Sequence, residues 1–245
     1  MSDRSAPRVA VLGVGLIGGS IGLAARARLG AEVAGYDPDP AMREAAVATG
    51  AADTATDSVA AACEGAEVVF CAAPVGRLPE LAAAALAAAG PDTAITDVGS
   101  TKREIVAAVG TDERFVGGHP LAGAETAGVA NARADLFEGA TWYLTPTERS
   151  DGVLFDRLQR AIAGLGARPQ AIDAEEHDRL MATVSGMPHA VANALVAEAA
   201  ADLTSGERVP VGGPSPDDAT RVAGSNPALW ADIFASNAVA VADSV

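Results

Sequence analysis

The stretch RVAVLGVGLIGGSIGLAARA, residues 8–27, decides the fold of this chain. It begins with an apolar, β-branched run, Val9–Leu12, which is typical of a buried strand. After a turn rich in glycine, apolar residues recur at Ile17, Ile21 and Ala25, the spacing of one face of a helix. The segment therefore predicts a strand, a tight glycine turn and a helix, in that order.

The glycines of this turn, Gly13, Gly15 and Gly18, match the pattern G-x-G-x-x-G of dinucleotide-binding folds. Alone, the pattern also fits an ordinary strand-to-helix turn. The next predicted strand, EVAGYD, ends at Asp37, about 20 residues further on, where a carboxylate takes the adenosine ribose hydroxyls. That carboxylate would repel a 2′-phosphate, so we expect NAD rather than NADP. The predicted cofactor-binding residues are Gly13, Gly15, Leu16, Ile17, Gly18, Asp37 and Pro74.

More strand-like runs follow, separated by helical or turn segments. This alternation predicts a Rossmann-type, doubly wound and mostly parallel sheet of the α/β class, with helices on both faces. Ligands of such sheets bind beyond the carboxyl ends of the strands. The predicted strands cover residues 66–72, 93–98, 114–118, 141–146 and 167–173.

Strand signals fade after residue 173, and we expect residues 1–172 to form the NAD-binding domain and 173–245 an all-helical second domain. Ser215 is expected to cap a short helix, and Pro227 to begin another.

The first long helical pattern of the second domain carries several polar residues. At 100° per residue, Asp178, Ser185 and His189 fall within about 20° of one line. Pro188, together with Gly186, is expected to kink the helix at that face.

Composition narrows the class of partner. The net charge is −15 and no basic run exists, which argues against nucleic acid and anionic membranes. The N-terminus lacks the apolar stretch of a signal peptide, and the run at 81–89 is too short to cross a bilayer, so we expect a cytoplasmic protein. Cys63 and Cys71 have no metal-ligand spacing and are expected to be reduced core thiols, with no metal site.

Several residues each have a functional and a structural interpretation. His119, in GGHPLAG (117–123), is either a histidine of a turn or a general base, and Ser100, in DVGSTK (97–102), is either a helix N-cap or a site residue. His189 and Asp178 could form a polar pair between helices, and Arg221 either a surface ion pair or a carboxylate anchor. For Trp230 and Glu125, packing and a solvated loop acid are the simpler interpretations.

Five motifs in this order resemble the prephenate and arogenate dehydrogenases, the oxidoreductases that close tyrosine biosynthesis. The resemblance runs over almost the whole chain, and the last two motifs are its most specific part. The motifs are GVGLIGGS (13–20), DVGSTK (97–102), GGHPLAG (117–123), MPHAVANAL (187–195) and DATRVAGSNPALWADIFASN (218–237).

The resemblance implies an NAD(P)-binding domain, a helical domain that builds a homodimer, and a small-molecule substrate, prephenate or arogenate, in the cleft between them. It implies that His119 is the general base, that Ser100 hydrogen-bonds near the same hydroxyl, and that Arg221 anchors a carboxylate. His189 and Trp230 would belong to the substrate pocket, Glu125 to its entrance, and Asp178 would orient the arginine.

Two departures from the family pattern matter. Gly186 replaces a polar residue of many relatives, which obscures substrate preference, and the chain stops at Val245, which puts the completeness of the dimer interface in question. Two alternatives remain open: a β-hydroxyacid-type dehydrogenase or imine reductase, and a non-catalytic NAD-binding protein. The first commonly uses a lysine of its helical domain, and this chain has only Lys102.

Overall fold

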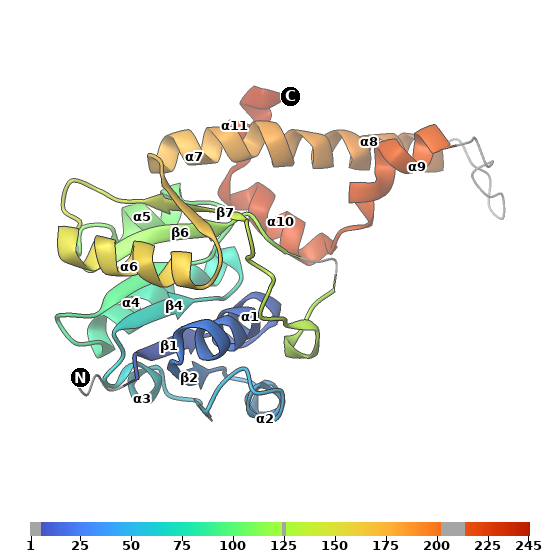
Figure 1. Ribbon diagram of the computed structural model, residues 1–245. Coiled ribbons are helices and arrows are strands. Elements are labelled where there is room, and N and C mark those ends of the chain that lie inside the picture. The colour runs from blue at the N-terminus through green and yellow to red at the C-terminus, as the bar shows by residue number, and fades with distance from the viewer. Residues whose placement is uncertain (1–5, 124–125, 202–213) are drawn as a thin grey trace. The chain divides into compact units, whose positions relative to one another are not determined.

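The computed structural model describes residues 6–123, 126–201 and 214–245. The chain divides into two compact units, Met1–His177 and Asp178–Val245. The first is an eight-stranded sheet with helices on both faces, and the second is helical (Figure 1). The strands are β1 (Arg8–Leu12), β2 (Glu32–Tyr36), β3 (Thr54–Thr56), β4 (Val68–Cys71), β5 (Ala94–Asp97), β6 (Phe115–Pro120), β7 (Thr141–Thr145) and β8 (Arg168–Ala171).

The sheet has the strand order β3-β2-β1-β4-β5-β6-β7-β8. Strands β1 to β6 run parallel, whereas β7 pairs antiparallel with β6, and β8 runs parallel to β7. The predicted doubly wound sheet is confirmed, with β3 as a strand that the sequence pattern did not indicate. The order reverses between β1 and β4, and in such sheets ligands bind in the crevice at that point.

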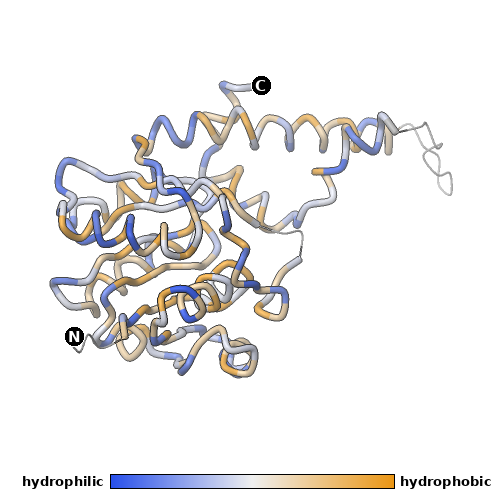
Figure 2. The backbone as a smooth tube through the Cα atoms, in the orientation of Figure 1, coloured by the Kyte–Doolittle hydropathy of each residue, from blue (hydrophilic) through white to orange (hydrophobic). Residues whose placement is uncertain are grey.

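Two apolar layers enclose the sheet because the central strands are buried on both faces. One layer joins the sheet to α1 (Leu16–Ala24), α2 (Pro40–Ala48) and α6 (Gly152–Gly164). The other joins it to α3 (Val59–Cys63), α4 (Leu78–Ala88) and α5 (Arg103–Val109). Figure 2 shows the hydrophobic residues concentrated in the central strands.

The second unit consists of helices. A helix of 28 residues, Ala174–Ala201, begins in the first unit as α7 (Ala174–Met181), passes through a π-helical turn at Ala182–Gly186 and continues as α8 (Met187–Ala201). Its first turns are hydrophilic and the later ones more apolar (Figure 2). Among the described residues, this helix alone is long and apolar enough to cross a membrane, by length and composition. The remaining helices are α9 (Pro214–Thr220), a 3₁₀ turn (Arg221–Gly224), α10 (Pro227–Ser236) and α11 (Ala238–Ser244).

The structure bears on three local predictions for these helices. Helix α9 begins at Pro214, so Ser215 lies inside it and is not its N-cap. The helix at Pro227 is confirmed, with Asn226 as its cap through hydrogen bonds from Ala228 and Leu229. The prediction that Asp178 and His189 lie on one line along the helix assumed 3.6 residues per turn throughout. The π turn between them interrupts that spacing.

Candidate functional site

The glycine turn after β1 has the geometry of a ligand cradle. Gly13 has a φ of +101°, and a Cβ there would lie 2.2 Å from the carbonyl oxygen of Ala72. A Cβ on Gly18 would lie 1.8 Å from the carbonyl oxygen of Gly13. At Gly15, by contrast, a Cβ would meet no atom within 4 Å. The fold itself therefore demands the first and third glycines, whereas the second leaves open space beside the start of α1.

Asp37 stands directly after β2 at the same edge of the sheet. Its Oδ2 accepts a hydrogen bond from the Val14 amide at 3.2 Å, and its Oδ1 accepts one from the Asp39 amide at 3.0 Å. These bonds tie the carboxylate to the glycine turn. Arg43, which the sequence spacing did not bring to notice, donates from Nη1 to the carbonyl oxygens of Asp37 and Pro38 at 2.7 and 3.0 Å.

A groove of 420 Å³ runs along this edge. Four predicted cofactor residues line it, whereas Leu16, Ile17 and Gly18 lie outside its lining, in the first turn of α1. The groove crosses the position where the strand order reverses, as expected for a dinucleotide site. The four predicted residues that line it are Gly13, Gly15, Asp37 and Pro74.

A buried ion pair follows β5 in the loop DVGSTK. Asp97 and Lys102, the only lysine of the chain, are both completely buried, and Lys102 Nζ donates to Asp97 Oδ2. The same carboxylate accepts hydrogen bonds from the amides of Gly99 at 2.7 Å and Gly118 at 2.9 Å. Asp97 therefore ties this loop to β6, one residue before His119.

Ser100 lies in the same loop and is half-buried. Helix α5 has Lys102 as its N-cap residue, so the interpretation of Ser100 as the cap of that helix is wrong.

His119 lies in strand β6, and its expected place on a bare turn is wrong. Its register partner is Tyr143 of β7, because the antiparallel pairing continues through Pro120. The two glycines that precede His119, Gly117 and Gly118, pack closely against neighbouring strands. A Cβ on Gly117 would lie 2.4 Å from Thr145 Oγ1, and one on Gly118 2.5 Å from the Asp97 carbonyl oxygen. The absence of side chains at these two positions therefore allows close contact with neighbouring strands.

The buried side chain of His119 contacts a second histidine that sequence reasoning missed. His119 Nδ1 lies 2.9 Å from Nε2 of His177, which is completely buried at the start of α7. The ring of Tyr143 meets His177 edge-on, with centroids 5.7 Å apart. Two features of the sequence could have indicated this residue: His177 is one of only three histidines, and it directly precedes Asp178.

The surroundings of His119 favour its neutral form. Burial lowers the pKa of this histidine well below its ordinary value, and His177 and the Lys102 cation lower it further. A neutral imidazole at physiological pH can accept a proton, as a general base must.

In the second unit, His189 and Trp230 form a stacked pair with ring centroids 3.4 Å apart. His189 Nδ1 lies 2.9 Å from the Ser185 carbonyl oxygen, which fixes it as the donor, and Nε2 lies 3.4 Å from Ser225 Oγ. Burial lowers the pKa of His189, and the Arg221 cation also lowers it. His189, Trp230 and Arg221 thus form one neighbourhood.

The remaining predicted residues lie elsewhere. Asp178 is completely buried, and its carbonyl oxygen accepts a hydrogen bond from Asn237 Nδ2 at 2.8 Å. Glu125 lies outside the described residues. Cys63 and Cys71 are buried free thiols, and burial raises the pKa of Cys63 to about 11.

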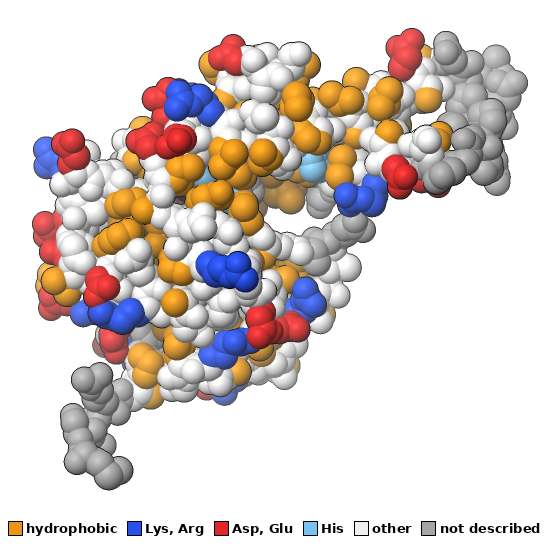
Figure 3. All heavy atoms as spheres, turned by 45° about the horizontal axis from the view of Figure 1, so that its top comes forward, with side chains coloured by type: hydrophobic (Ala, Val, Ile, Leu, Met, Phe, Trp, Pro, Cys, Tyr) orange, Lys and Arg blue, Asp and Glu red, His pale blue; other side chains and the backbone are white. Residues whose placement is uncertain are grey.

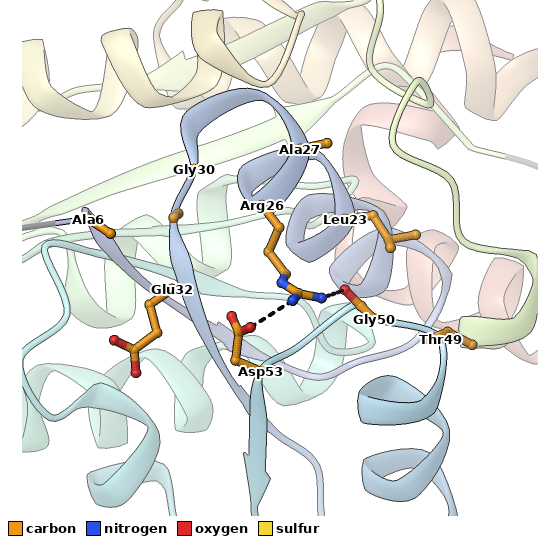
Figure 4. Close-up of a pocket in the computed structure, with 10 residues that line it drawn as sticks. Ala6, Leu23, Arg26, Ala27, Gly30, Glu32, Thr49, Gly50 and Asp53 are labelled. Atoms are coloured by element: carbon orange, nitrogen blue, oxygen red, sulfur yellow. Dashed lines mark hydrogen bonds and ion pairs between the residues drawn. The ribbon is translucent and has the colours of Figure 1, made fainter.

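A second hollow, of 620 Å³, lies at the opposite edge of the sheet, among residues that precede β1, β2 and β3 (Figure 4). Its cation, Arg26, donates to the carbonyl oxygen of Gly50 at 2.5 Å and pairs with Asp53 at 2.8 Å. Because ligands of such sheets bind at the carboxyl ends of the strands, these contacts are structural.

Two family models match the chain with little gap between them. Residues 21–171 match the nucleotide-binding domain of prephenate dehydrogenase, and residues 173–245 match its dimerization domain. The chain belongs to the prephenate dehydrogenase family. This membership argues against the β-hydroxyacid-type dehydrogenase that the sequence left open.

Similar proteins include enzymes for two substrates. The prephenate dehydrogenase of Bacillus subtilis is 36% identical over 243 residues, which are 94% of this chain and 64% of that protein. The chain thus spans slightly less than two thirds of that relative. The structure of Aquifex aeolicus prephenate dehydrogenase with hydroxyphenyl propionate and NAD⁺ is 33% identical, with a TM-score of 0.91, and covers 99% of this chain and 87% of that one. The structure of Synechocystis arogenate dehydrogenase is 28% identical, with a TM-score of 0.81, and the match covers 97% of this chain and 86% of that one.

Proposed function

We propose that this protein is an NAD-dependent dehydrogenase that oxidatively decarboxylates prephenate or arogenate. The observation that carries the proposal is the buried His119, whose pKa burial lowers, in a chain whose family acts on such substrates and whose sheet has a dinucleotide groove. The fit to the cofactor rests on Gly15, which leaves open space, and on Asp37, whose carboxylate is held at the groove. Gly13 and Pro74 would also hold the dinucleotide.

The chemistry needs one proton acceptor and one hydride acceptor. Bound NAD would accept the hydride from the carbinol carbon of the substrate. His119 takes the proton of the ring hydroxyl as the C–O bond becomes a carbonyl. The bond to the ring carboxylate then breaks, carbon dioxide leaves, its electron pair makes the ring aromatic, and the resulting phenolate oxygen takes a proton back from His119. Ser100 donates a hydrogen bond near the same hydroxyl.

The second unit supplies residues for the substrate's carboxylates. The planar guanidinium of Arg221 suits bidentate binding of a carboxylate. His189, held by Ser185 and stacked on Trp230, presents Nε2 as a further polar contact. We assign Asp178 to orienting the arginine and Glu125 to the entrance of the site.

The decisive assay follows reduced NAD when the purified protein is given prephenate or arogenate in parallel. Turnover of at least one is expected, and its absence with NAD binding intact would reject the proposal. His119→Asn should lower kcat about a hundredfold or more, because a general base is lost, while NAD affinity stays the same. The ratio of kcat/KM for the two substrates would settle the preference, which Gly186 leaves open.

We also propose that the protein is a cytoplasmic homodimer. Hydrophobic side chains gather along the long helix of the second unit (Figure 3). Val191, Leu195 and Val196 of α8 are 47%, 48% and 44% exposed, and Val239 of α11 is 67% exposed. Exposed apolar side chains of this kind are typical of an interface, and a second copy would cover them. Light scattering should give twice the mass of one chain.

A further inference from the structure

His177 is a buried polar residue without an assigned role in the proposed reaction. Burying a histidine costs free energy unless its ring nitrogens find partners. One partner is His119, at 2.9 Å between His119 Nδ1 and His177 Nε2. The two ring planes meet at 74°, edge to face, so the contact is a directed hydrogen bond and not a stack.

A hydrogen bond between two ring nitrogens needs one proton, and its position decides what His119 can do. If His177 donates, His119 carries its own proton on Nε2 and cannot act as a base through that atom. If His119 donates from Nδ1, its Nε2 is a bare acceptor. Only the second arrangement is compatible with general-base catalysis through Nε2.

We propose that His177 is the positioning residue of the catalytic base, because its Nε2 accepts the hydrogen bond from His119 Nδ1–H and so leaves His119 Nε2 free to take the substrate's proton. This inference rests on the proposed function. When His119 becomes an imidazolium, the same bond persists from a charged donor, which is stronger than the neutral bond.

The position of His177 is fixed by its own surroundings. Its backbone amide donates to the Asp173 carbonyl oxygen at 2.8 Å, in the first turn of α7. The Tyr143 ring packs against it, and Tyr143 is the register partner of His119. Strands β6 and β7 and helix α7 thus hold the two rings together.

His177 replaces the carboxylate that orients the histidine of a serine-protease triad. A carboxylate would raise the pKa of the base, whereas a neutral imidazole orients it without a negative charge. Among the described residues, the other titratable or charged groups around His119 are Tyr143 on β7 and the pair of Asp97 and Lys102 after β5. The base is therefore expected to remain active at mildly acidic pH.

Three variants test the inference by activity. His177→Phe keeps the ring volume and removes the acceptor, and should lower kcat about tenfold to a hundredfold, the usual effect of losing a supporting hydrogen bond. His177→Gln offers an amide oxygen in its place and should restore much of kcat. His177→Glu adds a negative charge and should move the acid limb of kcat/KM to higher pH. Met181→Leu, a buried site one turn further along the helix, is the matched control and should change neither value.

A merely structural role makes different predictions. It would lower stability in the Phe and Gln variants alike and leave kcat per folded enzyme and the pH profile unchanged, which would overturn the proposal. Thermal unfolding of each variant reports the folded fraction.

Imidazole ¹⁵N NMR tests the hydrogen bond without turnover. The chain has only three histidines, so single His→Gln variants assign every ring signal. We expect a protonated Nδ1 and a bare Nε2 on His119, and the opposite pattern would overturn the proposal. If the wild-type protein turned over neither substrate, the proposed function would fail while this measurement still decided the hydrogen bond.

Discussion

The buried pair of Asp97 and Lys102 should respond to mutation in a way that exposed ion pairs do not. Both side chains are completely buried, so Lys102→Met leaves a carboxylate without its cation, and Asp97→Asn leaves a cation without its carboxylate. Breaking a buried pair in this manner costs about 3–5 kcal/mol. The Lys102→Met cost should fall near the lower figure, because the amides of Gly99 and Gly118 still donate to Asp97.

The double variant Asp97→Asn/Lys102→Met should be more stable than either single variant. It leaves no buried charge at this site, and the amide oxygen of Asn still accepts a hydrogen bond from one of the two glycine amides. The other amide then loses its acceptor, at a cost of about 1–3 kcal/mol. We therefore expect a total loss of about 1–3 kcal/mol, below that of each single change.

Urea unfolding of the four proteins measures these differences, with a constant m-value as the check on two-state behaviour. Arg160→Met is the matched control, because it breaks an exposed pair with Asp156 and should cost less than about 1 kcal/mol. Single-variant losses below about 1 kcal/mol, or a double variant whose loss equals the sum of the two, would refute the reasoning.

Three further predictions concern the cofactor, pH and assembly. Gly15→Ala should leave thermal stability unchanged but weaken NAD binding in calorimetry, whereas Gly13→Ala should destabilise the fold because its φ is positive and a carbonyl fills the space; equal stability of the two variants would contradict this. The lowered pKa of His119 means that the unfolded chain binds more protons, so stability should fall as pH drops below about 6.5, by at most about 1.4 kcal/mol per pH unit, and His119→Asn should unfold with a shallower pH dependence. Val191→Glu combined with Leu195→Glu should give monomers in light scattering without loss of helix by circular dichroism; a persistent dimer would place the interface elsewhere.

Local sequence patterns predicted the strand, the glycine turn and the helix that position the groove, and four of the seven predicted cofactor residues line it. The glycine turn, the strand before it and Asp37 lie within 30 residues of one another, and their geometry follows from steric limits on the turn. The strands of the parallel sheet were predicted to within a few residues for the same reason. Strand β3 escaped because its three residues carry too short a pattern to recognise.

Long-range pairing decided what the patterns could not. The run at 114–118 was expected to end before His119, since glycine and proline commonly interrupt strands. The antiparallel partner β7 extends β6 through Pro120, which is the last residue of the strand, so the N–H that proline lacks falls at the strand's end. The π turn at Ala182–Gly186 likewise changes which residues share a face.

The sequence by itself thus determined the fold class and the dinucleotide motif, and it indicated His119 as a candidate base, because each depends on neighbouring residues and on residue type. Only the tertiary structure decided the setting of that histidine: a strand position and a ring contact with His177, 58 residues further along the chain, beside a buried Asp97–Lys102 pair. Hydrogen bonding and desolvation act over a few ångströms in space. Which side chains meet at that distance depends on how the strands and helices pack.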